Sequence, residues 1–169
     1  ALESIDVCNY PALRLCYLGG NGLRKARIEN IPSVYHLNLA SNKFEDFELD
    51  LAEGGIGGIT LTLSDNPITR LRLNTPKVTE FNYNNCLSMD TLDLTGMPEL
   101  RMCNVQNGTL KFVRFNQAAL DTCLVDLHLN YNRMAIDAFM GITPKMNPAL
   151  NYYAPQENPV IPETAAAGV

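Results

Sequence analysis

The residue types that most often carry chemistry are sparse in this chain. The two histidines, His36 and His128, each lie inside a short segment of alternating apolar and polar residues. Asp126 stands two residues before His128, the spacing that puts two side chains on one face of a β-strand. No Ser or Cys stands beside this pair at a spacing typical of nucleophilic catalysis. The sequence therefore predicts a chain that is not an enzyme.

Thiols are the next candidates for chemistry, and the five are Cys8, Cys16, Cys86, Cys103 and Cys123. The number is odd and no two form a Cys-x-x-Cys pair, so neither a disulfide framework nor a zinc site is predicted. Cys16 and Cys103 take apolar positions of alternating segments, where burial makes a thiol inert. Cys123 is expected to be the most exposed thiol. We expect no metal ion and no cofactor.

Charged residues, in contrast, recur at a nearly constant interval. One series alternates in sign at every step and consists of Asp6, Arg27, Glu48, Arg72, Asp93 and Arg114. A second alternating series is Lys25, Asp46 and Arg70. Carboxylates placed between arginines are expected to stay ionised and not to serve as acids. Such a regular interval indicates that an internal repeat positions these side chains.

The composition limits the class of protein that this repeat builds. The chain has 169 residues, of which 46% are hydrophobic, with a net charge of −5. It is too apolar to be disordered, and no apolar run approaches the roughly 18 residues that span a bilayer. With 13 Lys and Arg against 18 Asp and Glu, it lacks the basic excess of a nucleic-acid binder. Leu and Asn are in excess, at 23 and 18 residues.

The Leu and Asn excess comes from a repeated segment. Six segments follow the pattern apolar-x-apolar-x-x-Asn, two of them with Cys or Gly in place of the Asn, and are called Asn-turn segments; they begin at Cys16, Leu37, Leu61, Phe81, Cys103 and Leu127. A second type, mostly followed by Pro, alternates with them and begins at Ile5, Ala26, Phe47, Leu71, Leu92 and Val113; these are the Pro-turn segments. Each pair of segments forms one coil of about 21 residues, a period typical of solenoid repeats. The sequence therefore predicts a stack of about six coils with two short parallel strands per coil.

Stacking explains why the pattern needs Leu and Asn. A short strand alternates apolar and polar faces, and only stacked coils bury the apolar row continuously. The side chain where each Asn-turn strand ends should point inward and bond the turn backbone of neighbouring coils. This structural turn column consists of Asn21, Asn42, Asn66, Cys86 and Asn132, with Gly108 in the remaining slot.

The pattern L-x-x-L-x-L-x-x-N/C-x-L over residues 2–134 resembles the leucine-rich repeat family. The short period of about 21 residues is similar to that of repeats in bacterial secreted and cell-surface proteins. The resemblance implies a mainly β, right-handed solenoid that recognises proteins or glycans as part of a larger protein. The sequence departs from the pattern at Gly108 and at two insertions, over 53–58 and 121–124. The insertion over 53–58 is predicted to be a protruding loop. The alternative fold is a parallel β-helix with three strands per coil.

Beyond Asn132 the pattern stops. We expect the solenoid to span 1–132, a C-terminal cap 133–153 with a short helix over 133–141 and a final strand near Asn151, and an extended or disordered tail 154–169. No cap is evident before the first coil. Further N-terminal repeats, another domain, or a surface packed on that coil are therefore expected.

The two strand types differ in their outward residues. On the Pro-turn strands the charges cancel along an expected continuous ladder, which suits a structural surface. The outward residues of the Asn-turn strands, here the Asn-turn face, are rich in amides and hydroxyls that form no ion pairs and should remain available. The candidate ligand-binding residues are Tyr17, His36, Asn38, Thr62, Asn82, Asn104 and His128.

The function favoured by the sequence is recognition or adhesion, with a protein or glycan ligand, in a secreted or cell-surface bacterial protein. Nucleic acid and membrane insertion are not expected. Two alternatives remain open: a structural spacer in a multidomain surface protein, and the substrate-recognition part of a larger enzyme.

Overall fold

The computed structural model describes residues 2–52, 56–134 and 151–153. Short β-strands dominate these ranges. They are β1 (Ser4–Cys8), β2 (Leu15–Tyr17), β3 (Lys25–Glu29), β4 (His36–Asn38), β5 (Asp46–Asp50), β6 (Ile59–Thr62), β7 (Arg70–Asn74), β8 (Val78–Asn82), β9 (Thr91–Leu94), β10 (Met102–Asn104), β11 (Phe112–Phe115), β12 (Asp126–His128) and β13 (Asn151–Tyr153).

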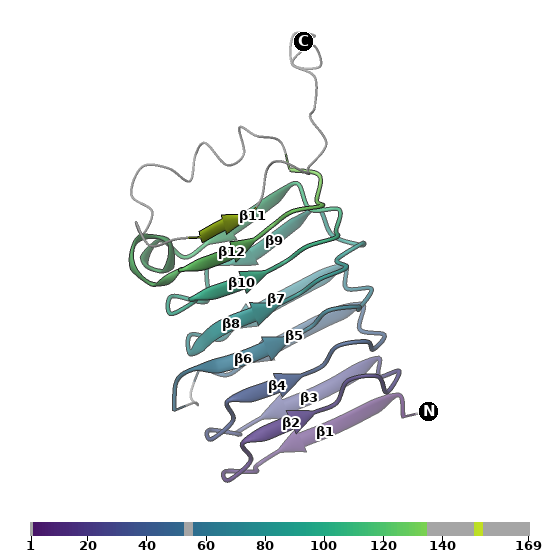
Figure 1. Ribbon diagram of the computed structural model, residues 1–169. Helices are drawn as coiled ribbons and strands as arrows, with labels where there is room; N and C mark the ends of the chain where they lie inside the picture. Colours follow the sequence, from purple (N-terminus) through teal and green to yellow (C-terminus); the bar gives the residue numbers. More distant parts are fainter. Residues whose placement is uncertain (1, 53–55, 135–150, 154–169) are drawn as a thin grey trace, which may run out of the picture.

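The strands wind into a parallel β-solenoid of about six coils, stacked from the first coil near the N-terminus to the last (Figure 1). One seven-stranded sheet has the order β13-β12-β10-β8-β6-β4-β2, and every neighbouring pair in it is parallel. Each described coil contributes two strands and not three, so the β-helix alternative is wrong. All twelve predicted strand cores fall inside strands, and the final strand expected near Asn151 is β13.

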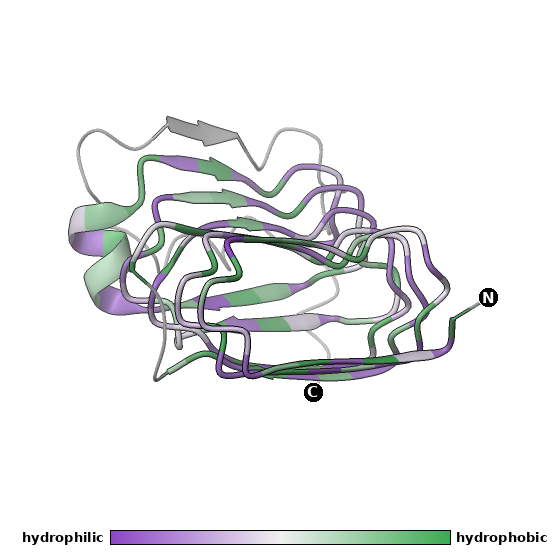
Figure 2. Ribbon diagram, turned by 90° about the horizontal axis from the view of Figure 1, so that it is seen from below, coloured by the Kyte–Doolittle hydropathy of each residue, from purple (hydrophilic) through white to green (hydrophobic). Residues whose placement is uncertain are grey.

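The alternation of apolar and polar residues accounts for the core. Leu37 is fully buried between half-exposed His36 and Asn38, and β12 repeats the arrangement around Leu127. Figure 2 looks along the stack, where hydrophobic and hydrophilic residues alternate along the superposed coils. The first coil is less protected, since Ile5, Leu13 and Leu18 are only partly buried.

Each Asn-turn strand ends in a tight turn with a left-handed residue. The residue before every turn-column position has a positive φ: Gly20, Ser41, Asp65, Asn85, Asn107 and Tyr131. Asn and Asp tolerate this backbone region better than most residues. These turns therefore account for part of the Asn excess, alongside the turn column and the Asn-turn face.

Asparagines of the turn column join neighbouring coils. The Asn42 amide oxygen accepts hydrogen bonds from the N–H groups of Asn21 (3.1 Å) and Leu23 (2.9 Å). Its amide nitrogen donates to the carbonyls of Leu18 (2.9 Å) in the preceding coil and Leu39 (3.0 Å) in its own. Asn66 and Asn132 repeat this arrangement. Asn21, in the first coil, is exposed and donates to carbonyls of its own coil.

Gly108 holds the turn-column slot of the fifth coil because no space is left for a side chain. A Cβ atom there would lie 2.5 Å from the Asn132 amide oxygen and 2.9 Å from the Cys86 carbonyl oxygen. Contacts this short essentially do not occur between real Cβ atoms and their neighbours. The departure from the repeat pattern thus makes room for the next asparagine of the column.

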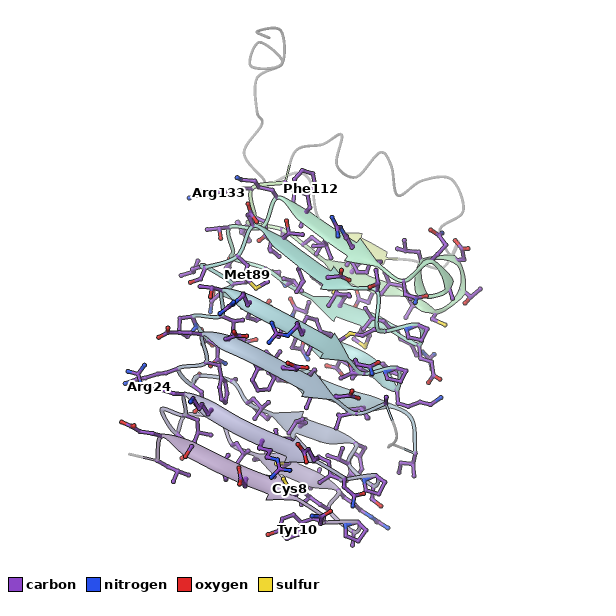
Figure 3. The ribbon with its side chains drawn as sticks, turned by 180° about the vertical axis from the view of Figure 1, so that it is seen from behind. Cys8, Tyr10, Arg24, Met89, Phe112 and Arg133 are labelled. Carbon is purple, nitrogen blue, oxygen red and sulfur yellow. The ribbon has the colours of Figure 1, made fainter. Side chains whose placement is uncertain are left out.

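The Pro-turn strands correct one expectation. These strands lie on the side of the solenoid that faces the viewer in Figure 3. They form three separate parallel pairs, β1–β3, β5–β7 and β9–β11, with no ladder bonds between β3 and β5 or between β7 and β9. The continuous charge ladder predicted from the sequence is therefore wrong. Its members pair by register only within strand pairs, as Asp6 with Arg27, Glu48 with Arg72 and Asp93 with Arg114.

The predicted insertions differ in structure. Residues Ala119–Cys123 form one turn of π-helix, η1, which overlaps the insertion over 121–124. In the other insertion Ile56 is 75% exposed, and Gly57 and Gly58 have positive φ values. The predicted capping helix over 133–141 lies largely outside the described residues.

Candidate functional site

The register of the seven-stranded sheet brings the predicted binding residues onto one face. Six of them form a single row of directly paired residues, the central row: Tyr17, Asn38, Thr62, Asn82, Asn104 and His128. His36 lies in the adjacent row, paired with Leu15 and Thr60. A register shift in the β6–β8 pair falls between Ile59 and Thr60, before the central row. The row itself is therefore uninterrupted.

An aromatic pair stands at the first-coil end of this face. The rings of Tyr17 and His36 have centroids 5.0 Å apart at an interplanar angle of 43°. The Tyr17 side chain is 59% exposed, and Leu15 beside it is 43% exposed. Because strand neighbours support one side of the Tyr17 ring, an apolar and relatively rigid surface faces solvent here.

Amide and hydroxyl groups follow along the central row, and several are bonded within the face. The Glu80 carboxylate accepts hydrogen bonds from the Thr60 hydroxyl (3.2 Å) and the Asn82 amide nitrogen (3.0 Å). The Gln106 amide nitrogen donates to the Asn104 amide oxygen at 2.6 Å. The expectation that these polar groups all remain available is therefore only partly right. Asn82 and Asn104 each keep one amide atom with no bonding partner among the described residues.

The histidines do not form a shared site. His36 is on β4 and His128 on β12, four strand steps or roughly 19 Å apart at the usual strand spacing. The His128 Nε2 atom lies 3.0 Å from an Asp126 carboxylate oxygen, and both side chains are about 30% exposed. The His128–Asp126 pair expected from the sequence thus exists on β12.

The thiols are placed by the same alternation. Cys16, Cys86 and Cys103 are buried, whereas Cys8 and Cys123 are partly exposed. Burial raises the pKa of the Cys16, Cys86 and Cys103 thiols, which removes the thiolate needed for nucleophilic attack. Within the described residues, no group of three or more His, Cys, Asp or Glu is arranged to hold a metal ion.

On the Pro-turn strands, the charges satisfy one another locally. Arg72 contacts both Asp46 (3.3 Å) and Glu48 (3.1 Å) across the β5–β7 pair. Arg27 instead bonds Glu29 on its own strand at 2.7 Å, which lowers the pKa of the Glu29 carboxyl. Exposed ion pairs of this kind contribute little to stability, because water and salt screen them. Their main effect is to leave this surface without a strong local field.

A cavity of about 500 Å³ opens where β3 and β5 fail to pair. Apolar residues, among them Ile31 and Leu51, line it together with Glu29 and Asp50. Asp50 accepts bonds from the Asn74 amide at 3.2 Å and from the Ala52 N–H at 2.9 Å. Both carboxylates at the rim are thus already engaged in structural bonds, and no residue of the predicted binding face lines this cavity.

Comparison with protein-family models, with curated proteins and with solved structures found no match to this chain. Among the described residues, no helix has the length and apolar character needed to cross a membrane.

Proposed function

We propose that this chain is a non-enzymatic recognition or adhesion module of the leucine-rich repeat type, belonging to a secreted or cell-surface bacterial protein. The repeat supports this proposal, since successive coils place Asn, Cys or Gly in the same turn slot. The ligand is a protein or a glycan, and it binds the Asn-turn face.

One observation carries the assignment to this face. The seven-stranded sheet is continuous, and its central row contains no Asp, Glu, Lys or Arg. The Pro-turn side is broken into three pairs, and in one of them, β5–β7, Arg70 and Arg72 pair with Asp46 and Glu48. A regular surface of anchored but partly unbonded polar groups suits ligand binding better than a surface of mutually neutralised ions.

A structural spacer is the competing function, and a specific observation favours it. Glu80, Asn82, Asn104 and Gln106 already bond within the Asn-turn face, as residues of an inert solvated surface do. A spacer predicts that no variant of either face changes binding to any partner.

Substitution of the two faces separates these functions. The triple variant Tyr17→Ala, Asn82→Ala and Asn104→Ala removes outward side chains of the central row. Its control exchanges the charges of one pair on the opposite side, as Glu48→Arg with Arg72→Glu. Binding to arrays of immobilised extracellular proteins and of glycans should fall for the triple variant alone. Loss of binding in the charge exchange, with the triple variant unaffected, would overturn the proposal.

A further inference from the structure

The central row has a spacing that selects among ligands. Each residue from Tyr17 to Asn104 is the direct register partner of the next, so one outward side chain is presented per coil. Neighbouring strands lie about 4.8 Å apart, which makes the row a straight series of about 19 Å. One pyranose unit lengthens a linear polysaccharide by a distance close to this spacing. Successive sugars of such a chain would therefore meet successive coils.

Each asparagine of the row has one amide atom fixed and the other presented. The Asn38 amide oxygen accepts the Ala40 N–H at 3.0 Å, which leaves its NH₂ group available as a donor. Asn82 is fixed through its NH₂ group to Glu80 and presents its oxygen as an acceptor. Asn104 is fixed through its oxygen to Gln106 and presents its NH₂ group. These presented atoms have no other partner among the described residues, so ligand hydroxyl groups would meet donors and acceptors already held in place.

The aromatic end of the row supplies the apolar contact that sugars need. One face of a pyranose ring exposes C–H groups, which stack on an aromatic ring. Tyr17, 59% exposed and held against His36, offers such a ring in line with the asparagines. A protein partner would more commonly be held by several clustered aromatic and arginine side chains, and the row contains one aromatic residue and no arginine between Tyr17 and Asn104.

The charge of the face restricts the ligand further. The rows beside the central row include the carboxylates of Glu80 and Asp126 and contain no Lys or Arg. A sulfated or uronic-acid polymer would bring negative charge against these carboxylates with no cation to compensate. The face therefore suits an uncharged ligand better than an anionic one.

We propose that the Asn-turn face binds a neutral, linear polysaccharide that lies across the strands along Tyr17, Asn38, Thr62, Asn82 and Asn104, with a sugar stacked on Tyr17. This inference rests on the proposed function, because it names the ligand of that same face. One sugar per coil gives about five sugars over these five coils.

The test is titration of the full chain with neutral oligosaccharides of two to six units, taken from the β-1,4-glucan, β-1,3-glucan, α-1,4-glucan, β-1,4-mannan, β-1,4-xylan and chitin series. In at least one series, affinity should rise with each added sugar up to about five and then level off. Heparin and polygalacturonate should not bind. Side-chain amide resonances of Asn38, Asn82 and Asn104 should shift on titration.

Tyr17→Ala should weaken binding at least about tenfold, as expected for the loss of one stacked ring. The matched control is Tyr10→Ala, because Tyr10 is a tyrosine of nearly equal exposure (55%) that lies outside the sheet. Both variants replace exposed rings, and thermal unfolding checks that each remains folded. Equal effects of the two variants would overturn the proposal.

Other outcomes separate this inference from the proposed function. No binding to any neutral oligosaccharide at millimolar concentration, or preferential binding of heparin, overturns the glycan inference alone. Binding to an immobilised protein that is lost in the central-row variants would then leave the recognition function standing with a protein ligand. Glycan binding that none of the central-row variants changes overturns both proposals, because the ligand would occupy another surface.

Discussion

Asn66→Ala tests whether the turn column holds the coils together. The side chain of Asn66 is 3% exposed. Its oxygen accepts the Phe44 N–H at 3.3 Å, and its NH₂ group donates to the carbonyls of Leu39 (3.0 Å) and Leu63 (2.9 Å). Removal of the amide therefore affects backbone groups of two consecutive coils.

The size of the effect follows from which groups keep a partner. The Leu39 carbonyl still accepts the Asn42 amide. Among the described residues, the Phe44 N–H and the Leu63 carbonyl have no other hydrogen bond, and both residues are fully buried. An unsatisfied buried group costs about 1–3 kcal/mol, so Asn66→Ala should lower the free energy of unfolding by about 2–6 kcal/mol. The total free energy of unfolding of a small domain is about 5–15 kcal/mol, so this loss would be a large part of it.

Urea denaturation followed by far-ultraviolet circular dichroism measures this difference. The matched control is Asn21→Ala, since Asn21 has the same position in the first coil but is exposed, and its NH₂ group bonds only the carbonyls of Leu18 and Gly19. Water can replace those bonds, so the control should cost less than about 1 kcal/mol. Equal losses in the two variants, or a loss below about 1 kcal/mol for Asn66→Ala, would refute the reasoning.

Three further predictions concern packing, thiols and acid stability. Gly108→Ala should lower the free energy of unfolding by about 1–3 kcal/mol, because the added Cβ would overlap the Asn132 amide oxygen. An unchanged midpoint of urea denaturation would contradict this. Ellman's reagent should modify Cys8 and Cys123 first, and the three buried thiols only on unfolding; simultaneous reaction of all five would contradict the burial. The Thr95 hydroxyl and N–H lower the pKa of the Asp93 carboxyl, so this carboxylate adds stability above its unfolded-state pKa that is lost as the pH falls through the folded-state value. The melting temperature of Asp93→Asn should therefore approach that of the unaltered protein as the pH falls from 7 to 3, and a constant difference would exclude this linkage.

The fold was predictable because each coil of about 21 residues contains the same short sequence pattern. Every predicted strand core, from Ile5 to Val113 and Leu127, lies in a strand, since alternation of apolar residues determines which face is buried. The turn at Ser41 was not predictable from propensity alone, because Ser rarely adopts a positive φ without a tertiary constraint. The turn of π-helix at Ala119–Cys123 likewise has no periodic signal of its own.

The candidate site was predictable in position and less so in chemistry. Repeat spacing alone placed Tyr17, Asn38 and Asn82 in one row. The bonds between Glu80 and Asn82 depend on side-chain rotamers, which the sequence does not specify. The expected charge ladder failed for a related reason. The repeat shows that Arg27 and Glu48 lie in consecutive coils. It does not show whether the backbones of their strands, β3 and β5, form hydrogen bonds, and in the structure they do not.

The connections between strands explain why the Asn-turn face remains regular while the opposite side does not. Connections from Asn-turn to Pro-turn strands cover residues 18–24, 39–45, 63–69, 83–90 and 105–111, and are thus nearly constant in length. Connections in the other direction vary widely, from the short segment 75–77 to the long segment 116–125. The connections of nearly constant length contain the turn column. There the side-chain amides of Asn42, Asn66 and Asn132 donate to backbone carbonyls of the preceding coil, which fixes the distance between coils. Coils therefore differ in length mainly in the connections that follow the Pro-turn strands. The central row that begins at Tyr17 is unaffected and keeps one residue per coil.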